Sequence, residues 1–238
     1  MLERQGYQVQ TTQLEVGALY SGVADGQLDL FLAAVPKVQS DYWDRFGKKF
    51  VVVGQWYDTL TQAVAVPNYT GITSMEQLRG KSSEFNGQII GIEAGSGLMR
   101  DLHTKAVNDY DLKDYKILDG STPAMLAALD RAIKARKPIA VTLWQPHWAF
   151  SKYPVVLLKD PKNSFGGNDV YKVIASKKFA SSNKKVNAEL AKFHMTPDEL
   201  QSLELKIAEA GQSKEQEAVK AWIAEHEDVV KSWTSAAE

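Results

Sequence analysis

The sequence contains no cysteine, which excludes disulfides, thiolate nucleophiles, iron–sulfur clusters and cysteine-ligated zinc within it. It has almost no net charge, because 28 basic residues face 29 acidic ones. A balanced chain offers no basic footprint, so we expect no nucleic-acid partner. No apolar run reaches the roughly 18–20 residues of a membrane helix. The first residues also lack a basic segment followed by an apolar one, so we expect no signal peptide in this sequence.

What the sequence does contain is typical of a globular protein. Its 238 residues are 44% hydrophobic, enough for one large domain or for two lobes of roughly 100 residues each. Strands alternate with helices, which predicts an α/β fold with a largely parallel sheet. One more strand, near Val170, follows a complete α/β unit. This order suggests two lobes joined by more than one crossover of the chain. The expected strands are 28–35, 50–53, 61–66, 88–92, 115–118, 138–143, 155–158 and 170–175, and the expected helices are 17–25, 74–78, 98–110, 123–135, 183–193, 196–210 and 214–233.

The beginning of the sequence has an unusual pattern. Leu2–Gln5 resembles the last turn of a helix, and Gly6 suits the position that follows one. Residues 7–11 then alternate between polar and larger side chains, which predicts a strand. Since chains rarely begin on the last turn of a helix, we expect that a strand and most of a helix precede this sequence in the intact protein. A chain without that front is expected to be poorly stable.

The segment Gly91-Ile92-Glu93-Ala94-Gly95-Ser96-Gly97-Leu98-Met99 is the first candidate site. It predicts a strand, a glycine-rich turn and a helix start, where free backbone N–H groups favour a carboxylate or phosphate. The full dinucleotide pattern is absent, because Arg100 occupies the place of its third glycine, and the Gly-Lys-Ser/Thr of a phosphate loop is absent too. Two interpretations remain open, an anion site and a plain tight turn.

Aromatic residues crowd the end of a later predicted strand. Thr142-Leu143-Trp144-Gln145-Pro146-His147-Trp148-Ala149-Phe150 follows it, and ligands of open α/β sheets lie beyond the carboxyl ends of strands. An exposed tryptophan face can hold a cation or an apolar group. For Trp148 and Phe150 we favour a lid over the core, whereas for Trp144 both interpretations stand. His147 has no acidic or hydroxyl partner nearby in sequence and is not expected to act as a base.

Other aromatic residues are assigned to packing. Tyr42-Trp43 and Gln55-Trp56-Tyr57-Asp58 lie near strand ends, where surface packing is the default. Trp222 and Trp233 have helical spacing among apolar residues and are expected to dock the last helix. Signals for an enzyme are weak, since there is no Gly-x-Ser-x-Gly elbow, no His-Glu-x-x-His motif and no acidic metal cluster. We therefore expect no catalysis, no metal and no cofactor.

Together these motifs resemble the substrate-binding proteins of ABC importers for glycine betaine, proline betaine and choline, the OpuAC/ProX type. The likeness runs from Gly6 to about Trp233. The matching stretches are Gly6-Tyr7, Gly26-Gln27-Leu28-Asp29, Val66-Pro67-Asn68-Tyr69, Gly91 to Gly97, Gly120-Ser121-Thr122-Pro123-Ala124-Met125, Trp144-Gln145-Pro146-His147-Trp148 and Asp160-Pro161-Lys162.

The resemblance implies a type II periplasmic-binding-protein fold of two lobes that close on a ligand. Residues 1–68 and 164–238 would form the first lobe, without its first strand and with the C-terminal helices packed on it, and 69–163 the second. Each lobe would be a mainly parallel sheet flanked by helices. The implied protein is extracytoplasmic, delivers a small zwitterionic or cationic solute to ABC permease subunits, and meets the membrane only through them. A ligand-sensing receptor module of the same fold is the alternative.

The resemblance also implies a binding site. The quaternary ammonium would lie on Trp144, and the carboxylate would accept N–H bonds from Gly97 and Leu98, beside Ser96. Two family features are changed, because Ala34 stands where a second tryptophan is usual and Gln39 stands where some members have a histidine. A third tryptophan would precede Met1. Trp56, Tyr57 and Trp43 are candidates to replace the aromatic surfaces that the two missing tryptophans would supply. We expect a ligand such as choline, carnitine or a bulkier betaine.

Overall fold

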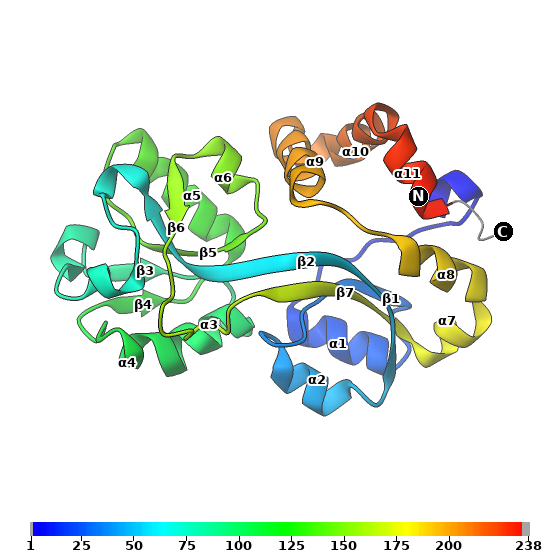
Figure 1. Ribbon diagram of the computed structural model, residues 1–238, viewed down its shortest axis with the longest axis horizontal. Helices are drawn as coiled ribbons and strands as arrows, with labels where there is room; N and C mark the ends of the chain where they lie inside the picture. The colour runs from blue at the N-terminus through cyan, green and yellow to red at the C-terminus, as the bar shows by residue number, and fades with distance from the viewer. Residues whose placement is uncertain (1, 235–238) are drawn as a thin grey trace. The chain divides into compact units, whose positions relative to one another are not determined.

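The computed structural model describes residues 2–234, which fall into two compact units (Figure 1). The first unit consists of Met1–Asp58 and Val170–Glu238, and the second is Thr59–Asp169. The boundaries predicted from sequence, after residues 68 and 163, therefore lie inside the second unit. Met1 and residues 235–238, which the prediction gave to the first lobe, lie outside the described residues.

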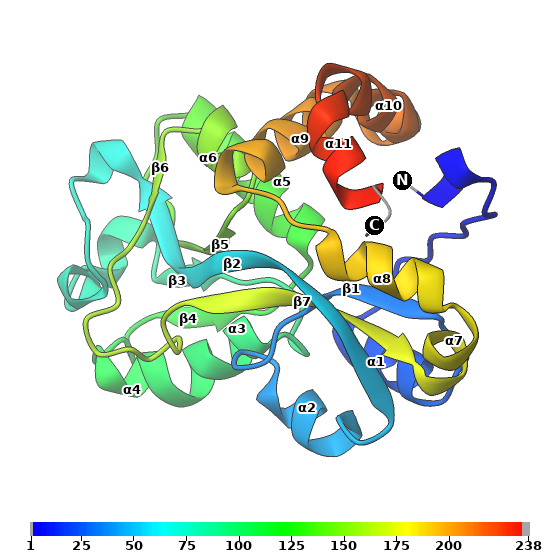
Figure 2. The same cartoon turned by 45° about the vertical axis from the view of Figure 1, so that its right-hand side comes forward.

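The first unit is built on two short strands and the start of a long one. Strand β7 lies between β1 and β2, and it is antiparallel to β1 with Leu30 opposite Ala175. Helices α1 and α2 lie on the other side of these strands from α9, α10 and α11 (Figures 1 and 2). The unit's elements are η1 (Leu2–Gln5), α1 (Val16–Ala24), β1 (Leu30–Ala34), α2 (Ser40–Phe46), the first half of β2 (Phe50–Pro67), β7 (Asp169–Ser176), α7 (Lys177–Ser182), α8 (Lys184–Lys192), α9 (Pro197–Ala210), η6 (Gln212–Lys214), α10 (Glu215–Glu225) and α11 (Glu227–Thr234).

The C-terminal helices are fastened to β2 by Trp56, which is buried. The indole stacks on Tyr171 at 5.1 Å between ring centroids and contacts Phe193 at 5.3 Å. Its backbone carbonyl accepts the N–H of Met195 at 3.0 Å. Phe193 in turn meets Trp233 edge to face, so α11 packs against α8, and Trp233 docks as expected. The single helix predicted over 214–233 is wrong, because the stretch breaks at His226 into α10 and α11. The C-terminal helices thus belong to the first unit, in agreement with the prediction.

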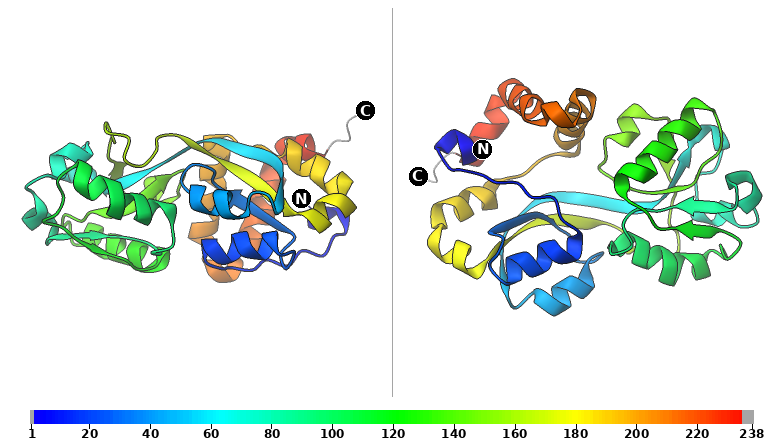
Figure 3. Two further views of the ribbon diagram at one scale, coloured as in Figure 1. Left: turned by 90° about the horizontal axis from the view of Figure 1, so that it is seen from below. Right: turned by 180° about the vertical axis from the view of Figure 1, so that it is seen from behind.

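The second unit has a mixed sheet covered on both faces. Its strand order is β2-β5-β3-β4, with β6 also paired to β2. Helices α5 and α6 lie on one side of β3, β4 and β5, and α3 and α4 on the other (Figures 1 and 3). The unit's elements are the second half of β2, η2 (Asn68–Thr70), η3 (Met75–Leu78), η4 (Ser82–Phe85), β3 (Gln88–Ile90), α3 (Gly97–Asp101), the π-helical turn η5 (Leu102–Ala106), α4 (Val107–Asp109), β4 (Lys116–Leu118), α5 (Thr122–Lys134), β5 (Val141–Gln145), α6 (Ala149–Lys152) and β6 (Val155–Leu157).

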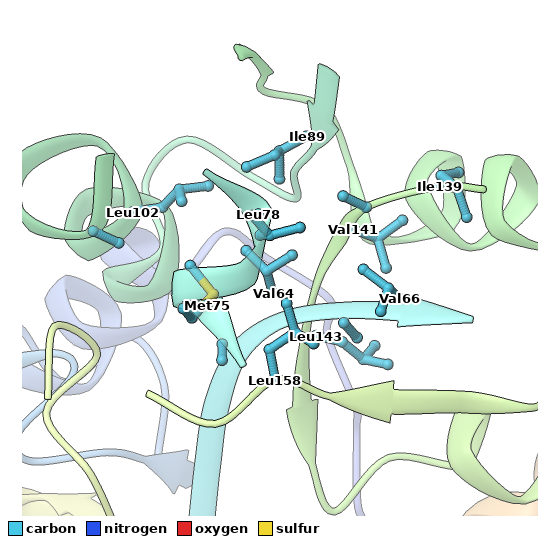
Figure 4. Close-up of a cluster of buried hydrophobic side chains, with 14 of the residues drawn as sticks. Val64, Val66, Met75, Leu78, Ile89, Leu102, Ile139, Val141, Leu143 and Leu158 are labelled. Atoms are coloured by element: carbon cyan, nitrogen blue, oxygen red, sulfur yellow. The ribbon is translucent and has the colours of Figure 1, made fainter. Parts of the chain in front are cut away.

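The core of the second unit lies where β2, β3 and β5 meet η3 and η5. Val64, Met75, Leu78, Ile89 and Leu102 are all at 0% exposure and converge there (Figure 4). Burying an aliphatic side chain of this size contributes about 1.5–3 kcal/mol each. This continuous core holds rigid the strand ends that carry both motifs of the candidate site.

The structure also corrects expectations about the strands. The strand pairing is mixed rather than mainly parallel, because β3 is parallel to β4 and β5 whereas β2 is antiparallel to β5 and β6. The strand predicted over residues 7–11 is wrong, since this stretch has no regular structure and Tyr7 and Val9 are exposed. An alternating segment needs a neighbouring strand to pair with, and none pairs with it here. The two strands expected at 50–53 and 61–66 are one continuous strand, β2.

Candidate ligand-binding site

The glycine-rich motif forms the predicted turn between β3 and α3. Ser96 is the N-cap of α3, and its hydroxyl accepts the N–H of Met99 at 3.2 Å. The N–H groups of Gly97 and Leu98 come first in the helix and therefore have no acceptor within it. Gly91 leaves room for the Met99 side chain, because a Cβ there would come within 2.2 Å of the Met99 Cε atom and 3.2 Å of the Leu118 carbonyl. The turn thus presents two backbone donors at the carboxyl end of β3.

The neighbouring helix start, at α5, already has an anionic partner. The two carboxylate oxygens of Glu93 accept the backbone N–H and the hydroxyl of Thr122, each at 2.9 Å. Ser121 caps the same helix by accepting the N–H of Ala124. Since carboxylates are stabilised at helix N-termini, Glu93 takes the place that an anionic ligand would occupy there. Of the two helix starts, at α3 and α5, the one at α3 remains available to a ligand.

Trp144 lies next to last in β5 and is half-buried. His147 supports its ring, with centroids 4.8 Å apart and the two planes perpendicular. The Nδ1 atom of His147 accepts the N–H of Ala149 at 3.0 Å, which places the remaining ring proton on Nε2. Trp144 is therefore held in one orientation while part of its surface stays accessible.

The protonation state of His147 matters to a cation on Trp144. His147 is 6% exposed, and burial lowers its pKa from the ordinary value near 6.5 to about 4. The imidazole is neutral at neutral pH as a result, so it brings no positive charge beside the indole. His147 acts as a support for Trp144, a role that sequence reasoning missed.

Trp148 is less suited to a ligand than Trp144. The ammonium of Lys152 lies 5.3 Å from the centroid of the Trp148 ring, and Tyr153 packs against the same indole at 6.0 Å. A cation of this chain thus already occupies the aromatic surface that a ligand cation would need. Trp148 belongs with the partly buried residues that cover the core.

The remaining predicted residues lie in the first unit and are engaged in packing or hydrogen bonds. Trp56 is 8% exposed and donates its indole N–H to the Leu32 carbonyl at 2.5 Å. Tyr57 is 3% exposed, and its ring centroid lies 5.9 Å from that of Tyr171.

Gln39 is engaged in hydrogen bonds within the first unit. Its side-chain oxygen accepts the Tyr20 hydroxyl at 2.7 Å and the Val35 N–H at 2.9 Å, which joins α1 to the chain after β1. Ser96, Gly97, Leu98 and Trp144 thus share the second unit, while Trp56, Tyr57 and Gln39 share the first.

Ala34, the position of the changed tryptophan, is fully buried. It packs in a small cluster with Tyr20, Phe31, Phe46 and Ile174. Its methyl group leaves no aromatic surface for a cation at this position.

A further polar residue in the site region was not singled out from sequence. Gln62 lies directly opposite Trp144 in the antiparallel pair of β2 and β5, and it is 8% exposed. A lone glutamine within the apolar run 61–66 is the sequence signal that could have drawn attention to it.

Comparison with known proteins decides the family. The model of the substrate-binding domain of ABC-type glycine betaine transport systems, OpuAC, matches residues 1–225. The chain belongs to the OpuAC family. A structure of lactococcal OpuAC in its closed, liganded conformation with glycine betaine is 33% identical, with a TM-score of 0.89 over 98% of this chain and 91% of that one. The glycine betaine/L-proline-binding protein ProX of Borrelia burgdorferi is 29% identical, with a TM-score of 0.89 over 98% of this chain and 88% of that one.

A curated relative of this OpuAC-family chain points the same way. The glycine betaine/carnitine transport binding protein GbuC of Listeria monocytogenes is 32% identical over 172 residues, which are 71% of this chain and 56% of that protein. The match thus spans little more than half the length of this relative. The OpuAC family consists of substrate-binding domains rather than enzymes, which confirms the prediction that the chain is not catalytic. Within residues 2–234, no helix is long and apolar enough to cross a membrane.

Proposed function

We propose that this chain is the extracytoplasmic substrate-binding component of an ABC importer for a quaternary-ammonium solute, of the glycine betaine, proline betaine, choline or carnitine class. It would deliver that solute to permease subunits. The observation that carries the proposal is the pairing, within one rigid unit, of a supported and partly accessible indole at Trp144 with two free N–H donors at Gly97 and Leu98.

The two halves of such a solute need different surroundings. A quaternary ammonium has no proton to donate, so an aromatic face is its natural partner and contributes about 2 kcal/mol when water is excluded. A carboxylate needs donors, and backbone N–H groups at a helix start supply them without bringing a charged side chain. We propose Trp144 for the first task and Gly97 and Leu98 for the second, with Ser96 fixing the turn.

For the first-unit residues we propose mainly supporting roles. Gln39 uses its side-chain oxygen to join α1 to the chain after β1. Trp56 and Tyr57 are surrounded by other aromatic rings. We propose that they stabilise the packing of the first unit together with Tyr171 rather than contact the solute.

Calorimetric titration of the full chain with glycine betaine, proline betaine, choline and carnitine tests the proposal. We expect at least one of them to bind, and Trp144→Ala to weaken that binding about tenfold or more. Trp148→Ala is the matched control, since its ring is engaged by Lys152, and it should leave the affinity nearly unchanged. Failure of all four solutes to bind the folded chain, or equal binding by the wild type and Trp144→Ala, would overturn the proposal.

A further inference from the structure

Two buried polar groups in the second unit have no hydrogen-bond partner among the described residues. They are the amide nitrogen Nε2 of Gln62 and the hydroxyl of Thr142, whose residues are 8% and 0% exposed. A buried donor without a partner is costly, and it usually marks a place where water or a ligand is bound. Both groups lie in strands at the centre of the sheet, where nearly all other side chains are apolar.

Strand register places both groups on the same face as Trp144. Gln62 is opposite Trp144, and Thr142 is opposite Val64. Residues opposite each other in a pair, and residues two apart along a strand, share one face of a sheet. Thr142 and Gln62 are therefore diagonal neighbours that both adjoin Trp144. The carboxyl end of β5 carries this group of residues, and the carboxyl end of the parallel strand β3 carries Ser96.

We propose that Gln62 and Thr142 recognise a hydroxyl group on the ligand, two carbons from its quaternary nitrogen. This inference rests on the proposed function, because it takes Trp144 as the seat of the ammonium. A ligand hydroxyl can accept a hydrogen bond from the Gln62 amide and form a second hydrogen bond with the Thr142 hydroxyl. One ligand group would therefore provide a partner for both buried polar groups. The ligand class is that of β-hydroxylated trimethylammonium compounds, of which carnitine also carries a carboxylate for Gly97 and Leu98.

Hydroxyl recognition of this kind discriminates strongly against analogues without the group. A compound that lacks the hydroxyl leaves buried donors unpaired, and this costs more than a missing apolar contact. Carnitine and γ-butyrobetaine form a matched pair, because they differ only in that hydroxyl. We expect the full chain to bind carnitine about tenfold or more tightly than γ-butyrobetaine in calorimetric titration.

Two substitutions test whether the named residues cause this preference. Gln62→Met keeps the length of the side chain and removes the amide, and Thr142→Val keeps its shape and removes the hydroxyl. Each should weaken carnitine binding while leaving γ-butyrobetaine nearly unchanged, so that the ratio of the two affinities falls towards one. Gln145→Met is the control, since Gln145 is exposed and points to the opposite face of β5.

A ligand-free readout guards against folding artefacts. Thr142→Val removes an unpaired buried hydroxyl, so we expect the Tm of the unliganded protein to stay level or rise. Equal affinity of the wild type for carnitine and γ-butyrobetaine, or a carnitine preference that survives both substitutions, would overturn the inference and leave the proposed function standing. Failure of every quaternary ammonium to bind would instead refute the proposed function.

Discussion

The two units of this chain bury their apolar residues to different degrees. In the second unit, one continuous core joins every strand to the helices on both faces. In the first unit, the cluster around Tyr20 and Phe31 is smaller, and Trp56, Phe193 and Trp233 form another packed group. Among the described residues, the large apolar side chains that are exposed lie in this unit, namely Tyr7, Val9, Leu14, Leu32, Val51 and Val52. The proposed contacts at Trp144, Gly97 and Leu98 are on the well-packed unit. A preorganised site needs such a rigid support.

The largest expected effect compares one leucine in each unit. Leu143 in β5 is fully buried, so Leu143→Ala should lower the free energy of unfolding of the second unit by about 2–5 kcal/mol. Leu32 in β1 is 42% exposed, and Leu32→Ala should change the stability by no more than about 0.5 kcal/mol.

Urea titration combined with hydrogen exchange measures both effects, because exchange reports the second unit separately through the amides of β5. We expect those amides to be the best protected of the chain in the wild type. Similar costs for the two substitutions would show that the packing contrast between the units is wrong.

A smaller effect is expected from pH in the second unit. Unfolded His147 binds a proton below a pH near 6.5, whereas the folded, buried imidazole resists protonation until about pH 4. The unfolded state therefore binds more protons between these values, and stability falls as the pH is lowered through this window. The full loss is up to about 3 kcal/mol, complete near pH 4 and absent above about pH 7.

Thermal melts of the wild type and of His147→Asn between pH 4 and 7 measure this effect. Asparagine keeps an acceptor near the Ala149 N–H but does not titrate, so the variant should have a flatter profile. Identical profiles for the wild type and His147→Asn would contradict the assignment of a neutral, buried His147.

Local signals in the sequence predicted much of the second unit correctly. The helix expected over 123–135 forms as α5 and is capped by Ser121, since a capping side chain bonds only a few residues away. The strand–turn–helix at Gly91 to Met99 and the tryptophan at the end of β5 also lie where the patterns placed them. These features depend on short-range chemistry, which periodicity and residue type report well.

Features that depend on distant partners could not be predicted. The strands expected at 50–53 and 61–66 are one strand, β2, and Gly54 lies inside it, where a Cβ would come within 2.8 Å of the Leu190 carbonyl. The glycine permits α8 to approach the strand, and nothing near Gly54 in the sequence reveals that. Strand direction, the support that His147 gives to Trp144, and the opposition of Gln62 to Trp144 are likewise set by tertiary pairing.

The central claim is that the second unit holds a quaternary-ammonium carboxylate between an indole and a helix start. Nuclear magnetic resonance of the ¹⁵N-labelled full chain, titrated with glycine betaine and with carnitine, tests it most directly. The account predicts that the backbone amide signals of Gly97 and Leu98 and the indole signal of Trp144 shift together and saturate with the ligand, while the indole signal of Trp148 moves little. Saturable binding that leaves the signals of Gly97, Leu98 and Trp144 unchanged would contradict it.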